Sequence, residues 1–128
     1  MSKSQKVHPD TRREVLARAY FTCEYCGWKN SSLNIHHRTP RGMGGTRVKE
    51  INEPANLLVL CGSGTTGCHG WVESNREQAY ELGLLVRRGQ DAEVVPFTNK
   101  EGQMFTILND GTKFLWVETT EKGTQNDL

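Results

Sequence analysis

The sequence predicts an α+β domain, because two kinds of apolar spacing occur in it. Apolar residues recur with helical spacing in residues 10–20 and 71–82, whereas short strand-like runs occupy residues 33–37 and 57–60. At 128 residues the chain can form one domain with a modest core. We expect a disordered lead over residues 1–9, a main domain over 10–82, accessory strands over 83–118 packed on or beside it, and a polar tail over 119–128.

The first half is expected to contain one helix and two strands. Asp10 or Thr11 can cap a helix that runs to about Tyr20. In the strand over residues 33–37, strict alternation places His37 and His36 on opposite faces, although a distortion at the strand end could turn either one. The second strand covers residues 57–60, after a turn.

The second half is expected to begin with a helix and continue as strands. The helix over residues 71–82 would stop at Gly83, which suits a helix C-terminus. The turn Asn109-Asp110-Gly111 is a strong hairpin signal, so we predict an accessory C-terminal β-hairpin. The short strands are predicted at residues 84–87, 94–97, 105–108 and 113–117.

The composition predicts a soluble, cytoplasmic protein with no membrane partner. Apolar residues make up 35% of the chain, and no apolar run approaches the roughly 18 residues of a membrane span. The N-terminus lacks the apolar segment of a signal peptide. Residues 1–50 carry 10 Lys or Arg against 4 Asp or Glu, and residues 51–128 carry 6 against 11. A basic first part is compatible with phosphate binding.

The four cysteines favour a zinc site over two disulfides. They occur as Cys23-x-x-Cys26, followed by Cys61 and Cys68. In a reducing compartment two spaced pairs are more typical of a Cys₄ zinc site. Gly27 would let the backbone turn so that amides face the sulfurs. The six residues between the second pair must loop out.

A glycine-rich segment with basic residues follows the two histidines. Glycine allows close approach to phosphate, and Arg38, Arg41 and Arg47 supply positive charge, so these three are candidate DNA contacts. A flexible connector explains each basic residue about equally well.

The combination of motifs resembles a known nuclease family. His36-His37 in a strand, Asn56-Leu-x-x-Leu-Cys61 and then Cys68-His69 opening a helix resemble the HNH endonucleases of the ββα-metal superfamily, in particular the small HNH proteins of tailed bacteriophages. The resemblance covers about residues 23–75. It implies a ββα-metal core stapled by the Cys₄ zinc site.

The resemblance also implies a role for each residue of the motif. His37 would be the general base, His36 and His69 ligands of a catalytic divalent metal, and Asn56 the middle residue of the motif. Asn56 could ligate the metal or hold His37 in place by hydrogen bonds, and both options stay open here. A histidine suits proton transfer near neutral pH, and a divalent metal stabilises the leaving oxygen.

The third ligand of the catalytic metal departs from the family pattern. Where many HNH proteins have another histidine, one helical turn after His69, this sequence has Glu73, with Asn75 two residues later. A carboxylate at this spacing can reach a shared metal and favours Mg²⁺ or Mn²⁺, but Ni²⁺ and Zn²⁺ also remain candidates. Water in place of Glu73 is the open alternative.

We therefore expect a metal-dependent endonuclease that nicks or cuts double-stranded DNA. The family context implies a phage-encoded enzyme linked to genome packaging, with a terminase as a partner. The competing hypothesis is a zinc-stapled DNA-binding module without catalysis. Such a module would need the four cysteines but not His36, His37 and His69 together.

Overall fold

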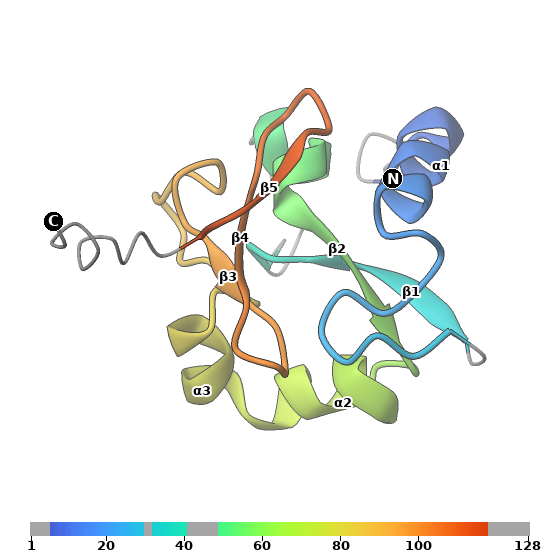
Figure 1. Ribbon diagram of the computed structural model, residues 1–128, viewed down its shortest axis with the longest axis vertical. Helices are drawn as coiled ribbons and strands as arrows, with labels where there is room; N and C mark the ends of the chain where they lie inside the picture. The colour runs from blue at the N-terminus through green and yellow to red at the C-terminus, as the bar shows by residue number, and fades with distance from the viewer. Residues whose placement is uncertain (1–5, 30–31, 41–48, 118–128) are drawn as a thin grey trace, which may run out of the picture.

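The α+β class is confirmed by the computed structural model, which describes residues 6–29, 32–40 and 49–117 (Figure 1). The elements are α1 (Pro9–Arg18), β1 (Leu33–His37), η2 (Lys49–Asn52), η3 (Pro54–Asn56), β2 (Leu57–Cys61), α2 (Gly67–Ser74), α3 (Arg76–Glu81), β3 (Phe97–Thr98), β4 (Met104–Ile107) and β5 (Lys113–Leu115). Helix α1 comes first, β1 and β2 follow, α2 and α3 come next, and three strands end the described chain; the strands form two small antiparallel sheets.

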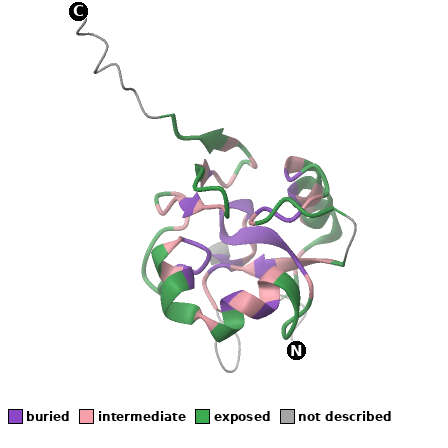
Figure 2. Cartoon of the chain, turned by 60° about the horizontal axis from the view of Figure 1, so that its bottom comes forward, coloured by how far each residue is buried: buried purple, intermediate pink, exposed green. Residues whose placement is uncertain are grey.

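The pair of strands β1 and β2 lies in the middle of the molecule. The strands are antiparallel, with His36 opposite Leu58 and His37 opposite Leu57. Every residue of β2 is buried, because both faces of the pair are covered (Figure 2). One face packs on α1, through Leu57 and Val59, and the other packs toward α2. The histidines thus lie at the end of a strand that pairs along its whole length with the buried strand β2.

Helix α1 begins earlier than the sequence predicts. His8, rather than Asp10 or Thr11, caps it, since its Nδ1 accepts a hydrogen bond from the Asp10 amide at 3.0 Å. Pro9 is the first helical residue, a position where the missing amide proton costs nothing. The apolar side of the helix, with Val15 buried, then faces β2. Pro9, which the sequence predicts to lie in a disordered lead, is therefore helical.

An ion cluster joins α1 to the C-terminal sheet. Arg18 pairs with buried Glu24 at 2.7 Å and also donates to the Leu57 carbonyl. Lys113, at the start of β5, pairs with the same carboxylate at 3.1 Å. The Glu24 carboxylate also accepts a hydrogen bond from the Val59 amide. This network attaches the segment with the first two cysteines to β2.

The helix predicted over residues 71–82 is two helices. Helix α2 starts at Gly67, and Asn75 separates it from α3 with a backbone that is not helical. The Asn75 side-chain amide donates to the Trp71 carbonyl at 2.9 Å. Gly83 does follow α3 as expected, at φ +75°, where an added Cβ would collide with the Pro96 carbonyl. The backbone there turns so tightly that only glycine fits.

The C-terminal part is a three-stranded sheet, order β3-β4-β5. The predicted hairpin is present as β4 and β5, with Gly111 at φ +93° in its turn. The prediction of a strand over residues 84–87 is wrong. That stretch is irregular, and its apolar side chains fill the core. Of the strand predicted over residues 94–97, only Phe97 is in a strand, β3, which continues to Thr98. Within the described residues, no helix has the length and apolar character to cross a membrane.

Candidate metal centres

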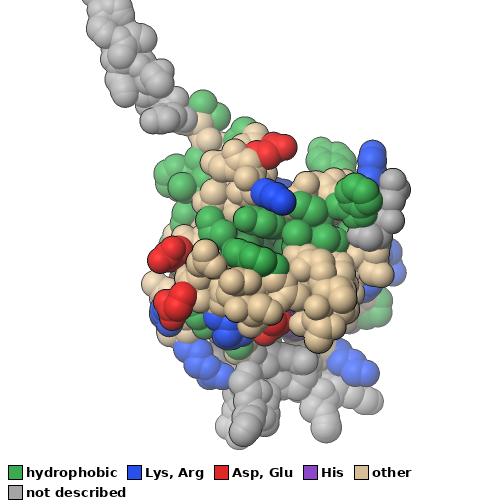
Figure 3. Space-filling model, turned by 90° about the horizontal axis from the view of Figure 1, so that it is seen from below, with side chains coloured by type: hydrophobic (Ala, Val, Ile, Leu, Met, Phe, Trp, Pro, Cys, Tyr) green, Lys and Arg blue, Asp and Glu red, His purple; other side chains and the backbone are tan. Residues whose placement is uncertain are grey.

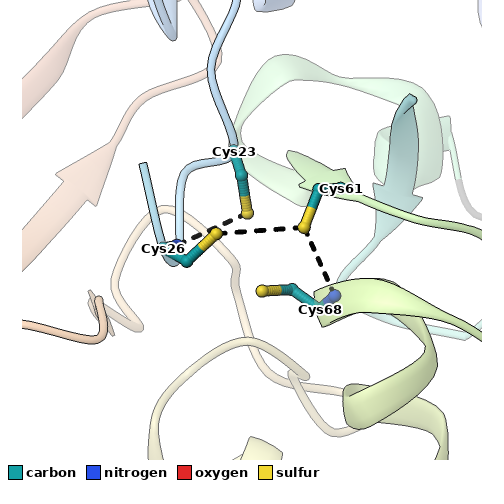
Figure 4. Close-up of side chains that lie close together, drawn as sticks. All are labelled: Cys23, Cys26, Cys61 and Cys68. Carbon is teal, nitrogen blue, oxygen red and sulfur yellow. Dashed lines mark hydrogen bonds between the residues drawn. The ribbon is translucent and has the colours of Figure 1, made fainter. Parts of the chain in front are cut away.

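Four cysteine sulfurs converge from three parts of the chain (Figure 4). Cys23 and Cys26 come from the loop after α1, Cys61 ends β2, and Cys68 lies in the first turn of α2. All four are free thiols, and their sulfurs lie within 4.8 Å of one another. The Sγ atoms of Cys26 and Cys61 are 3.8 Å apart. Four sulfurs bound tetrahedrally to zinc at about 2.3 Å lie about 3.8 Å from each other, so the cluster is compatible with structural zinc.

Local backbone turns aim amides at these sulfurs. The Cys26 amide donates to the Cys23 sulfur at 3.4 Å, and the Cys68 amide donates to the Cys61 sulfur at 3.5 Å. The predicted turn at Gly27 is present, at φ +82°. Amide donors of this kind stabilise thiolate ligands.

The long spacing between the second pair of cysteines is closed by a compact loop. The Ser63 amide donates to the Thr66 carbonyl at 3.0 Å, so the chain folds back on itself. Gly67 lies against Cys61 at φ +63°, and a Cβ there would lie 2.6 Å from the Cys61 carbonyl oxygen. The loop therefore depends on glycine for the approach of Cys68 to Cys61.

The thiols differ in how readily they ionise. Burial raises the pKa of Cys23 and of Cys68. Burial also acts to raise the pKa of Cys61, but hydrogen bonds from Cys68, Cys26 and Cys23 outweigh it and lower that pKa overall. Because only thiolates bind zinc, metal binding must displace protons from the buried thiols.

A second cluster lies beside the first. His36 of β1, together with His69 and Glu73 of α2, places ligand atoms within 4.8 Å of one another. The two imidazole rings are 5.3 Å apart at an interplanar angle of 67°. Successive helical residues point about 100° apart, so Cys68 and its neighbour His69 serve different clusters. Glu73, one turn after His69, lies on the same side of the helix.

Hydrogen bonds fix which imidazole nitrogen faces this cluster. A carbonyl oxygen only accepts, so His36 donates through Nε2 to the Leu84 carbonyl at 2.9 Å and keeps its lone pair on Nδ1. His69 contacts the Asn34 side-chain oxygen through Nδ1 at 3.2 Å, which leaves the lone pair on Nε2. Metal-binding histidines commonly donate their other nitrogen to a carbonyl in this way. Burial lowers the pKa of His36 to about 3, so its imidazole is neutral near pH 7.

The orientation of His37 is set by an asparagine. Its Nε2 lies 2.7 Å from the Asn52 side-chain oxygen, and the Asn52 amide nitrogen donates to the Lys6 carbonyl at 3.2 Å. That second bond determines which way the amide points, so His37 donates through Nε2 and carries its lone pair on Nδ1. His37 lines a pocket of about 330 Å³ that His36, His69 and Glu73 also line.

Asn56 holds the backbone next to the histidines. Its side chain is buried, accepts from the Thr39 amide and donates to the Ile51 carbonyl, both at 2.9 Å. Its own carbonyl accepts from the Arg38 amide at 2.8 Å. Of the two roles left open by the sequence, this geometry supports the hydrogen-bonding one.

Arg38 is not a DNA contact, and that prediction is wrong. Its side chain is completely buried, and burial lowers its pKa to about 10. The guanidinium lies inside the protein, where it donates hydrogen bonds to main-chain carbonyl oxygens. It donates to the carbonyls of Gly83, Ala55, Ala92 and Val95. The other two candidate contacts, Arg41 and Arg47, lie outside the described residues.

Four contributions to this region were not predicted. Asn34 could have been found, since it lies two residues before His36 and therefore on the same strand face. Arg76 lines the pocket and follows Glu73 by three residues, a spacing that brings helical side chains together. Asn52 and the Leu84 carbonyl carry no local signal, because they reach the histidines only through the fold.

The fold and these clusters define a small α+β protein with a four-cysteine cluster able to bind a metal such as zinc. Searches of protein-family models, curated proteins and solved structures give no match to this chain.

Proposed function

We propose that the protein is a metal-dependent endonuclease of HNH type that hydrolyses phosphodiester bonds of DNA. One observation carries the proposal. His36, His69 and Glu73 converge within 4.8 Å, and the same pocket is lined by His37, the proposed base. A metal-ligand set and a general base in one open pocket are the minimum that phosphodiester hydrolysis requires.

The donor atoms suit a hard or borderline divalent ion. Nδ1 of His36, Nε2 of His69 and a carboxylate oxygen of Glu73 would hold it. The bound ion supplies Lewis-acid stabilisation of the phosphate and of the leaving 3′ oxygen. Since the set mixes imidazole with carboxylate, Mn²⁺ or Mg²⁺ fits it well, and Ni²⁺ and Zn²⁺ are worth testing.

His37 would take the proton from the attacking water through Nδ1. The water oxygen then forms a bond to phosphorus while the bond to the 3′ oxygen breaks, and that oxygen leaves with the electron pair. Asn52, which accepts from Nε2, stabilises the imidazolium that results. Asn56 keeps the segment after His37 in place through the Thr39 amide.

The four cysteines would hold a structural zinc. All four coordination positions of a tetrahedral ion are then filled by protein, which leaves none for substrate. Such a zinc ties the loop after α1 to β2 and to α2, and so fixes His69 relative to β1. The sequence resemblance further motivates the proposal that the enzyme acts beside a phage terminase.

A plasmid-nicking assay tests the proposal. Purified protein should convert supercoiled plasmid to open-circle or linear form only when Mg²⁺, Mn²⁺, Ni²⁺ or Zn²⁺ is added. His37→Ala should lower that rate by about 10²–10⁴-fold, because a general base contributes that much. Glu101→Ala is the control, since Glu101 is exposed in the turn between β3 and β4 and is not among the described residues that line the pocket.

Two results would contradict the proposal. A folded wild-type protein that binds DNA but nicks it with none of these metals would favour the non-catalytic DNA-binding module. Nicking by His37→Ala at the wild-type rate would remove His37 as the base.

A further inference from the structure

An arginine shares the pocket with the proposed catalytic residues. Arg76, the first residue of α3, lines the pocket beside His36, His69 and Glu73. Its Nη1 donates to Glu73 Oε1 at 3.0 Å, and both side chains are 42% exposed. The cation is therefore in contact with a candidate metal ligand and still open to solvent.

A second arginine offers a natural comparison. Arg76 and Arg87 both lie over the ring of Tyr80, at 6.0 Å and 4.0 Å from its centroid. Arg87 also approaches Glu77, at 3.7 Å. It is not among the described residues that line the pocket. Cations and carboxylates are interspersed along one edge of the face that carries α2 and α3 (Figure 3). Of the two arginines over Tyr80, Arg76 is thus the one that lines the pocket.

We propose that Arg76 binds the scissile phosphate and that Glu73 exchanges Arg76 for the metal. This inference rests on the proposed nuclease function. A carboxylate that ligates a divalent ion loses its attraction for a neighbouring guanidinium. The guanidinium then needs another anion, and a phosphate fits its planar set of donors in a bidentate manner.

The ion pair between Arg76 and Glu73 can separate at little cost in free energy. Glu73 and Arg76 are three residues apart, exposed, and joined by a single contact. Exposed pairs of this kind contribute little to stability, because water screens them. Once metal has taken the carboxylate, Arg76 remains at the wall of the pocket where the phosphate must lie. Metal and DNA should therefore bind cooperatively, and each should raise the affinity for the other by the same factor.

DNA binding tests the phosphate contact without relying on catalysis. In a His37→Ala background, fluorescence anisotropy of a labelled duplex is measured in saturating Mn²⁺ over a range of salt. Arg76→Ala should weaken DNA binding about tenfold. It should also reduce, by about one, the steepness with which the logarithm of DNA affinity falls against the logarithm of salt concentration. The DNA affinity of Arg76→Lys should lie between those of the parent and of Arg76→Ala, since lysine keeps the charge but lacks the planar donors. Arg87→Ala should stay within about twofold of its parent.

Manganese binding without DNA separates this role from a purely structural one. If Glu73 exchanges partners, Arg76→Ala should bind Mn²⁺ as tightly as the parent, or more tightly, in a titration followed by electron paramagnetic resonance. If Arg76 only holds Glu73 in place, Mn²⁺ affinity falls while DNA binding in saturating Mn²⁺ is unchanged, and the inference is wrong. Equal losses for Arg76→Ala and Arg87→Ala would also overturn it. Failure of the nuclease proposal is seen separately, as absence of nicking by wild type.

Discussion

The four-cysteine cluster and the His36–His69–Glu73 cluster are supplied by neighbouring residues of α2, yet they differ in what they can do with a metal. Cys68 faces three other sulfurs, so the first cluster offers a complete tetrahedral ligand set. His69 faces one imidazole and one exposed carboxylate at the wall of a pocket. The first arrangement leaves no ligand position to fill, and the second opens on the pocket.

The supporting bonds differ in the same way. Main-chain amides of the nearby turns donate to the cysteine sulfurs, so that cluster is organised mostly by local backbone. The imidazoles depend on distant partners, since His36 donates to the Leu84 carbonyl and His69 to the Asn34 side chain. We infer that metal at the first cluster contributes mainly to folding and metal at the second mainly to chemistry.

The largest expected effect is a difference in stability and zinc content between variants at two adjacent residues of α2. Cys68→Ser should abolish zinc binding and unfold the domain. Apparent binding free energies of structural zinc, about 10–16 kcal/mol, match or exceed the about 5–15 kcal/mol stability of ordinary domains. His69→Ala should cost about 1 kcal/mol, since it loses one side-chain hydrogen bond. Thermal unfolding and elemental zinc content measure both effects. Equal melting temperatures and zinc contents in the two variants would show that the clusters do not differ in this way.

A smaller effect, on metal affinity, is expected from substitution of Asn34, the residue that orients His69. Asn34→Ala should weaken Mn²⁺ binding about 10–100-fold with the fold and the zinc retained, because partners of metal ligands typically contribute that much. Asn34→Asp keeps an acceptor for the His69 Nδ1 proton and is expected to bind Mn²⁺ at least as tightly as wild type. Calorimetric titration with Mn²⁺ measures all three proteins. An alanine variant with wild-type affinity would mean that the Asn34 contact does not organise the cluster.

The smallest effect is expected at the exposed ligand. Glu73→Ala should raise the Mn²⁺ concentration needed for half-maximal nicking roughly fivefold, since water can replace one exposed carboxylate. Glu73→His should shift the preference toward Zn²⁺ or Ni²⁺. Glu77→Ala, four residues further along in α3 and paired with Arg87, serves as the control. Superimposable activation curves for wild type and Glu73→Ala would show that Glu73 does not bind the metal.

The sequence by itself determined the features that depend on near neighbours. The α+β class follows from apolar spacing, and the hairpin of β4 and β5 follows from the Asn109–Gly111 turn. The spacing of the cysteines predicted a four-sulfur cluster, which the structure contains. Turn chemistry, side-chain periodicity and ligand spacing act over a few residues, so they can be recognised in the sequence alone.

Tertiary structure alone decided the environment of each side chain. Arg38 belongs by sequence to a basic, glycine-rich segment, but the fold buries it among carbonyls from residues 17 to 57 positions away. The Leu84 carbonyl that orients His36 lies 48 residues further along the chain. It comes from a stretch whose apolar residues predicted a strand, although packing in the core holds it in an irregular path. Burial and hydrogen bonding depend on which distant segments come into contact, and these contacts cannot be recognised in a local pattern of residues.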